Sequence, residues 1–564
     1  MLSKLGSFTS RMLRRGGGNA FRLLSGIVHK EVEKTPMTAK LWELRKQQLL
    51  REASLHPKGG SESVRSEPRI MDKGVFDSRV EMTYRFGSDL HLKDLYLDSG
   101  GNVLIGKLFE DLDSLAGTVA FLHSQDDSPD TPPAQLVTAS CEAITLRRPI
   151  PTSKDIVLVG QVGWVGKSSL DVIVEVHEGR GTEPVFALLG SASPTLLLSS
   201  VFTYVSRNRA TGKPLAVNRL VLDPLPSPGS STTAHLKPGC SSSSTARIEL
   251  EAQWGFQRQR EAAALARKAS LSPAPALPSA AAKPTPTSTP TPTSTSTSTS
   301  TSTSTSTSTS TSTSTSTSVP PIDPARSRET ALLEAGRCLQ DLPALAAPHT
   351  ILISQTQIDH SFICHPQNTN TAGRVFGGFL MHRAYDIAES CAYQFGGRLP
   401  SLISCDRILF KRAVEIGDLV RLRARVCASA PSAAAAGATA GATAGATAGA
   451  TAGAAAADNL VVVDVVAHVV QPSASPPSSH ESNTFTFIFG FPSPTTVSTG
   501  SAGSAGSAGS AGSAGSAGSA GGQGVQQMRA VLPRSPEEAL TIRRAEERLS
   551  SLLQERGKGG GMRT

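Results

Sequence analysis

The chain has 564 residues and a formal net charge of +9, so it has room for two or more domains. Six positive residues precede the first acidic residue, Glu31, and leave the rest of the chain only slightly basic: Lys4, Arg11, Arg14, Arg15, Arg22 and Lys30. Because no basic stripe alternates with aromatic residues, the composition gives no support to a nucleic-acid-binding function.

Residues 1–30 are predicted to be an organelle transit peptide. They are basic, contain Ser and Leu, and include no acidic residue. The apolar stretches in this segment are too broken for a secretory signal peptide or a membrane span. We expect import into the mitochondrial matrix, and the chloroplast is the alternative compartment.

Residues 31–222 are predicted to form a first folded domain. A turn followed by a helix is expected at 101–116, and a strand is expected at 136–146. Residues 155–176 have the pattern of two strands joined by a turn that contains glycine. The Gly-Lys-Ser-Ser sequence in that turn does not predict a phosphate loop, because it lies between strands and lacks the upstream glycine.

Low-complexity sequence separates this domain from the next. Residues 223–345 are a predicted linker, in which the stretch 273–319 is rich in Pro and Ala and then alternates Thr with Ser. Such a stretch buries too little apolar surface to offset the entropy of ordering it. A second domain is expected at 346–490, with an insertion rich in Ala, Gly and Thr at 431–457. Residues 491–564 are expected to be a low-complexity tail with a terminal helix.

The most informative segment lies in the second domain. Residues 365–376 are polar and favour turns, and the pair Gly377-Gly378 follows them. A helix is predicted next, at about 379–395, because no Pro or Gly interrupts it. Free N–H groups at the start of such a helix suit an oxyanion or a polarised carbonyl group. A plain tight turn is the alternative interpretation of the glycine pair.

Strands are predicted after this helix. Residues 401–410 are strand-like, and polar and apolar residues alternate over 419–427, which indicates a half-buried strand. One helix followed by antiparallel strands is an α+β pattern. The order of features resembles the hotdog fold of acyl-coenzyme A thioesterases, in which an antiparallel sheet wraps around a long central helix.

The segment from Arg374 to Met381, together with Ala384-Tyr-Asp386, is most similar to the mitochondrial acyl-CoA thioesterase 9 group. The first domain repeats the same order of turn, helix and strands. The resemblance therefore implies a tandem (double) hotdog fold in the α+β class.

The resemblance also implies an active site between the two domains. In this family a polar residue before the helix of one domain meets a carboxylate on the helix of the other. These positions correspond to Asn102, which would orient water, and Asp386, which would act as general base or nucleophile. Gly377 and Gly378 would offer backbone N–H groups to the thioester oxygen.

The reciprocal pair implied by the resemblance is Arg374 with Asp113, and Gly106 would bind the substrate in the first domain. This pair departs from the family pattern, because it has one glycine and an Arg where many relatives have Asn. We therefore expect Asn102 and Asp386 to form the active site and the reciprocal site to be degenerate. Tyr385 stands where many relatives have a carboxylate, which leaves the position of the acid open by one residue.

The periodicity of the helix gives a second interpretation of Asp386. It points away from the apolar stripe formed by residues such as Ala384 and Ala388, as a solvated carboxylate would. Seven cysteines without a Cys-x-x-Cys pair predict reduced thiols, and the Cys364-His365 neighbours are not expected to form a nucleophile and base. No histidine spacing predicts a metal site.

The resemblance implies an acyl-CoA thioesterase that hydrolyses acyl-CoA to a free fatty acid and coenzyme A without a cofactor. Two alternatives remain: an enoyl-CoA hydratase on the same fold, and a non-catalytic acyl-CoA-binding protein. The expected partner is the acyl-CoA substrate, with no nucleic acid and no membrane span. By analogy with related proteins, the subunits are expected to form a homo-oligomer.

Overall fold

The computed structural model describes residues 34–55, 69–126, 134–179, 195–208, 211–222, 255–263, 324–370, 373–430, 459–471, 478–491 and 528–559. The predicted transit peptide, the Thr/Ser tract and the Ala/Gly/Thr insertion lie outside these residues. Within them, no helix has both the length and the apolar character that a membrane span requires.

Twelve strands from both halves of the chain form one sheet, and every neighbouring pair in it is antiparallel. The N-terminal half contributes β2 (Val80–Tyr84), β5 (Ile156–Val165), β6 (Ser169–Glu178), β7 (Leu196–Arg207), β4 (Ile144–Leu146) and β3 (Gln135–Cys141). The C-terminal half contributes β11 (Ser401–Cys405), β15 (Ser478–Phe491), β14 (Asn459–Gln471), β13 (Leu419–Ala430), β10 (Ile358–Ile363) and β12 (Ile408–Leu409).

The two halves of the sheet meet where β4 pairs with β11 and β3 pairs with β12. Cys405 lies opposite Ile144, and Ile408 lies opposite Cys141; all four side chains are buried. The strand predicted at 136–146 is two strands, β3 and β4. Both pair with β7, and in the other half β3 pairs with β12 and β4 pairs with β11.

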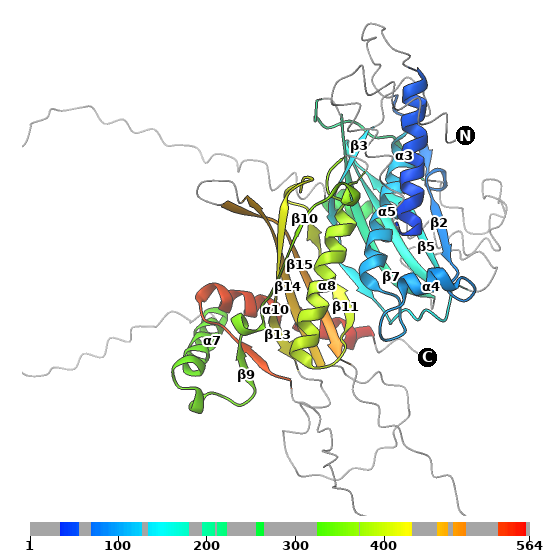
Figure 1. The fold of residues 1–564 in the computed structure, drawn as a ribbon. Coiled ribbons are helices and arrows are strands. Elements are labelled where there is room, and N and C mark those ends of the chain that lie inside the picture. Colours follow the sequence, from blue (N-terminus) through cyan, green and yellow to red (C-terminus); the bar gives the residue numbers. More distant parts are fainter. Residues whose placement is uncertain are drawn as a thin grey trace, which may run out of the picture.

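Helix α5 (Ile105–Ser124) and helix α8 (Gly377–Gly396) lie beside each other against one face of the sheet (Figure 1). Each is 20 residues long. Their apolar residues are in the core, for example Leu108 and Leu112 of α5 and Met381 and Ala388 of α8. Gly397 caps the end of α8, and its φ of 69° is the left-handed conformation that favours glycine at a helix end.

The same backbone contacts precede both helices. Leu104 N donates to Tyr96 O at 2.6 Å, and Phe376 N donates to Asn368 O at 2.8 Å. Each residue of the second contact lies 272 positions after its counterpart in the first. The same 272 positions separate Glu110 of α5 from His382 of α8, which contact each other. Further contacts recur at this spacing: the bridge Leu97–Val103 with Thr369–Val375, the bond Asp98–Asn102 with Asn370–Arg374, and the turn at Gly101 with that at Gly373, both with φ of 85°.

Shorter elements surround this centre. Helix α3 (Pro36–Leu55) packs along α5, and the short helix α4 (Leu90–Tyr96) precedes α5 in the chain. Helix α7 (Pro324–Asp341) packs against α10 (Pro536–Gly559). Two small parallel pairs join β1 (Asp72–Gly74) to β8 (Arg219–Val221) and β9 (Thr350–Leu352) to β16 (Ala530–Leu532).

The α+β class expected from the sequence is confirmed: one large antiparallel sheet carries two long helices. The range 223–345, expected as a linker, contains helical residues at 255–263 and the whole of α7. Helix α7 is ordered because it buries Leu332 in the core, and the low-complexity composition stops just before it.

Candidate active site

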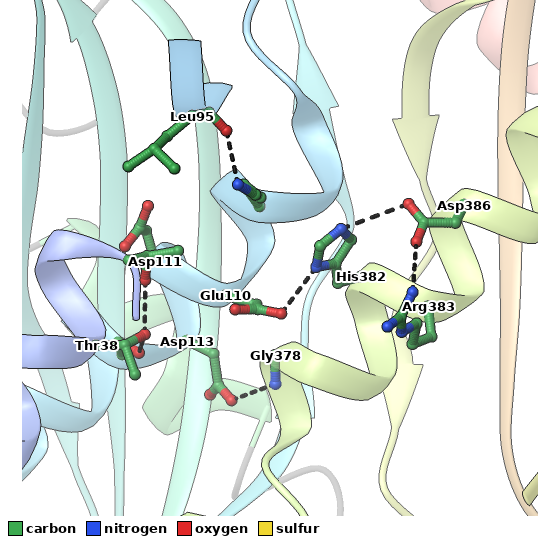
Figure 2. A network of polar contacts seen from close by, with 12 residues as sticks. Thr38, Leu95, Glu110, Asp111, Asp113, Gly378, His382, Arg383 and Asp386 are labelled. Carbon is green, nitrogen blue, oxygen red and sulfur yellow. Dashed lines mark hydrogen bonds and ion pairs between the residues drawn. The ribbon is translucent and has the colours of Figure 1, made fainter. Parts of the chain in front are cut away.

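Asp113 lies in the middle of α5, and only 1% of its surface is exposed. Its Oδ2 accepts the backbone N–H of Gly378, in the first turn of α8, at 2.7 Å (Figure 2). Its Oδ1 accepts the hydroxyl of Tyr204 at 2.8 Å and the hydroxyl of Thr138 at 3.2 Å. A single carboxylate thus receives donors from two strands and from the helix of the other half.

Two opposing effects act on the pKa of Asp113. Burial raises the pKa above its usual range, because desolvation disfavours the charged form. The hydrogen bonds from Tyr204, Gly378 and Thr138 lower it, since they stabilise the carboxylate. The net shift is upward, which is the direction that makes a carboxylate a stronger base.

Gly377 lies close to this carboxylate. A Cβ atom at Gly377 would lie 3.0 Å from Oδ2 of Asp113 and 3.2 Å from the ring of Phe410. Any side chain at Gly377 would therefore crowd the carboxylate and the aromatic ring. Gly377 and Gly378 both belong to the first turn of α8, where backbone N–H groups lack partners within the helix. The position suits a polarised carbonyl oxygen.

Asn102 and Asp386, the pair expected to be active, have other partners. Asn102 donates its backbone N–H to Oδ1 of Asp98 at 2.7 Å. Asp386 lies 3.5 Å from Nε2 of His382 and 3.5 Å from Arg383, and 39% of its side chain is exposed. Among the described residues, no hydrogen bond or ion pair joins Asn102 to Asp386.

Asp386 belongs to a cluster between the two central helices (Figure 2). Oε1 of Glu110, on α5, lies 2.8 Å from Nδ1 of His382, on α8. Burial raises the pKa of Asp386, while His382 and Arg383 lower it. Gly106 faces this cluster, because a Cβ there would come within 3.2 Å of Oδ1 of Asp386.

Arg374 does not reach Asp113 in this arrangement. Its guanidinium forms an ion pair with Glu415 at 3.0 Å, and its backbone N–H donates to Oδ1 of Asn370 at 3.1 Å. Of the two residues expected as a reciprocal pair, Asp113 therefore contacts the opposite half through Gly378, and Arg374 contacts the loop before β13.

The repeat identifies the counterpart of Asp113. At the spacing of 272 residues, the equivalent position on α8 is Tyr385. Its hydroxyl donates to Glu389 at 2.9 Å, and its ring packs against Phe109 and Phe487. Only one of the two equivalent helix positions therefore carries a carboxylate.

Thr138 and Tyr204 were not predicted from the sequence as site residues. They lie on β3 and β7, 25 and 91 residues from Asp113, and no local motif surrounds either. Cys364 is buried, and desolvation raises the pKa of its thiol to about 11, which disfavours the nucleophilic thiolate. Within the part of the chain that the structure describes, no three His, Cys, Asp or Glu side chains are grouped to hold a metal ion.

Comparison with known proteins gives a consistent family. No family model matches the chain. The chain is 30% identical to acyl-coenzyme A thioesterase 2, chloroplastic, of Humulus lupulus over 455 residues, which cover 81% of this chain and 80% of the relative. It is 28% identical to the mitochondrial acyl-coenzyme A thioesterase 4 of Humulus lupulus, over 83% of this chain and 69% of the relative. The mitochondrial acyl-coenzyme A thioesterase 9 of Homo sapiens is 26% identical, over 64% of this chain and 66% of the relative.

Solved structures with similarity include the acyl-CoA hydrolase of Staphylococcus aureus in complex with butyryl coenzyme A, at 17% identity and a TM-score of 0.24, over 36% of this chain and 94% of that one. Another is the 12:0-ACP thioesterase of Umbellularia californica, at 7% identity and a TM-score of 0.33, over 74% of this chain and 95% of that one. The chloroplastic thioesterase of Humulus lupulus shows the family, because its 30% identity extends over most of both sequences. The chain belongs to the acyl-coenzyme A thioesterase family.

Proposed function

We propose that the protein hydrolyses acyl-CoA thioesters to a free carboxylic acid and coenzyme A, with Asp113 as the general base. The observation that carries this proposal is the bond from Gly378 N–H to Oδ2 of Asp113 at 2.7 Å. It brings a buried carboxylate to the start of a helix, where a base and an oxyanion site lie side by side.

The chemistry follows from these contacts. Asp113 removes a proton from water, and the oxygen attacks the thioester carbonyl carbon. Before substrate binds, the N–H of Gly378 donates a hydrogen bond to Asp113. In the reaction this N–H donates to the developing oxyanion instead. Losing that donor makes the carboxylate more basic when the base is needed. The thiolate of coenzyme A then leaves as the carbonyl reforms, and it receives the proton held by Asp113.

We further propose that the fold is a tandem hotdog with one hydrolytic site per chain. Support comes from the contacts that recur at a spacing of 272 residues before α5 and α8. Tyr385 replaces the carboxylate at the second site and donates to Glu389. This proposal reverses the assignment expected from the sequence, since it makes the site of Asp113 the active one and gives Asp386 another role.

The protein is proposed to act in an organelle, with the mitochondrial matrix as the compartment. Relatives are named mitochondrial or chloroplastic, and residues 1–30 have a basic composition free of acidic residues. Fusing these residues to a fluorescent protein tests the proposal. Fluorescence in the cytosol would contradict organelle import, and fluorescence in the chloroplast would correct the compartment.

Steady-state release of free thiol from acyl-CoA tests the proposed activity. A thioesterase releases one thiol for each acid formed. Consumption of a 2-enoyl-CoA without thiol release would instead indicate a hydratase, and binding without turnover would indicate a non-catalytic protein. We also propose a homo-oligomer in solution, and sedimentation of a monomer alone would contradict it.

A further inference from the structure

Glu110 and His382 occupy equivalent positions in the two central helices, and they contact each other. The spacing between them, 272 residues, is the spacing of the repeat. A residue that touches its own counterpart lies on the local two-fold axis between the halves. Their side chains are mostly buried, with 21% and 16% exposed, and Oε1 of Glu110 lies 2.8 Å from Nδ1 of His382.

The two helices approach each other closely around this pair. A Cβ atom at Gly378 would lie 2.9 Å from Cα of Glu110. A Cβ atom at Gly106, the equivalent glycine, would lie 2.3 Å from Cδ2 of His382. Each glycine thus makes room for one member of the pair, and a side chain at either position would push the helices apart.

The pair also adjoins the proposed site on both helices. Glu110 precedes Asp113 by three residues, and His382 follows Gly378 by four, so each lies about one helical turn from a site residue on the same helix. A displacement of one helix along the other at Glu110 and His382 therefore changes the distance from Asp113 to the N–H of Gly378.

We propose that Glu110 and His382 are a positioning pair that holds the Asp113 carboxylate against the start of α8. Asp386 adds to this role, because its Oδ1 lies 3.5 Å from Nε2 of His382 and restricts the rotation of the ring. Neither member of the pair touches the reacting atoms in this account. The inference rests on the proposed function of Asp113.

Because the two positions are equivalent, they can be exchanged. The central variant combines Glu110→His with His382→Glu, and it is compared with Glu110→Ala, His382→Ala and the double Ala variant. Glu110→Gln keeps an acceptor for Nδ1. As a matched control, Glu329→Ala removes a helix–helix ion pair far from the site, since Glu329 lies 2.7 Å from Arg543 between α7 and α10.

The single Ala variants should lower kcat by about tenfold to a hundredfold, as small misplacements of a catalytic group do, with KM little changed. The double Ala variant should be no slower than the slower single variant, because both changes remove one contact. The exchanged variant and Glu110→Gln should recover most of the lost kcat. Glu329→Ala should keep the wild-type kcat.

An exchanged variant that folds but is as slow as the double Ala variant would overturn the proposal, as would folded Ala variants with wild-type kcat. If the Ala variants fail to fold, the exchanged variant decides alone: recovery of activity supports the pair, and failure to fold or turn over contradicts it. Asp113→Asn, measured in parallel, separates the two proposals. If it retains full activity, Asp113 is not the general base and the positioning pair has no site to hold; if it is inactive and the exchange does not rescue, only the positioning pair is wrong.

Discussion

The backbone N–H of Gly378 donates to Oδ2 of Asp113 at 2.7 Å, although the two residues are 265 positions apart in the sequence. One belongs to the first turn of α8 and the other to the middle of α5. Neither half of the chain can form this contact alone. The active site proposed for the protein therefore depends on how the two central helices cross.

The activity should fall on the acid side of its pH profile at a higher pH than for an ordinary carboxylate base. Burial raises the pKa of Asp113, and the hydrogen bond from Tyr204 lowers it. Tyr204→Phe removes that donor, so the pKa should rise further and the acidic limb of kcat/KM should move to higher pH. Tyr393→Phe, at a half-exposed position on α8, is the control. An acidic limb that stays in place in Tyr204→Phe would show that another group controls it.

Gly378→Ala should destabilise the protein and slow it. The new Cβ atom would lie 2.9 Å from the backbone of Glu110 and 2.7 Å from the ring of Phe376, so α5 and α8 must separate. Overpacking of this kind costs about 1–3 kcal/mol of unfolding free energy. Gly255→Ala, whose new Cβ would meet no atom within 4 Å among the described residues apart from its own chain neighbours and local helix backbone, should keep the wild-type melting temperature. Equal melting temperatures for the two variants would argue against the close helix crossing.

Asp111 should make the stability depend on pH. Its side chain is fully buried beside Tyr96 and accepts the N–H of Met37 at 3.3 Å from α3. Burial raises its pKa from 3.8 to about 7. The folded protein therefore holds a proton that the unfolded chain releases between these values. The stabilisation that this proton gives to the folded state is fully present below pH 3.8 and is lost as the pH rises through about 7.

The measurement is urea unfolding of the wild type and of Asp111→Asn from pH 4 to pH 8. Asn at position 111 cannot titrate, so only the wild type loses this stabilisation as the pH rises. The unfolding free energy of the variant minus that of the wild type should therefore increase between pH 4 and pH 8, by up to roughly 4 kcal/mol. Asp72→Asn is the control, because the Asp72 side chain is 62% exposed. A difference between wild type and Asp111→Asn that does not change with pH would mean that Asp111 keeps an ordinary pKa.

Much of the fold could be predicted from local sequence. The uninterrupted run after the glycine pair gives α8, and the alternating run that begins at Leu419 gives β13. The terminal helix also agrees, as α10. The break between β3 and β4 could not be predicted, because it depends on pairing with β11 and β12 from the other half of the chain.

The candidate site shows the same limit. The sequence drew attention to Asp113 and Gly378, but it could not show that they touch. Neighbouring residues of a helix point about 100° apart. Whether the family's carboxylate position falls on Tyr385 or on Asp386 therefore decides which of these side chains faces the sheet. The structure has Tyr385 buried and Asp386 partly exposed. Thr138 and Tyr204 reach Asp113 only through the pairing of β3 with β7, which no motif encodes.

The most direct measurement compares kcat for thiol release by Asp113→Asn and Asp386→Asn. Asn is nearly isosteric with Asp and cannot act as a base, so circular dichroism should confirm that both variants fold. Asp113→Asn should lose about 10²–10⁴ in kcat, or roughly 3–5.5 kcal/mol of transition-state stabilisation. Asp386→Asn should keep most of its kcat, because the Asn oxygen can stay beside Nε2 of His382 and the side chain does not touch the proposed reacting atoms. A silent Asp113→Asn beside an inactive Asp386→Asn would contradict the account and assign the base to Asp386.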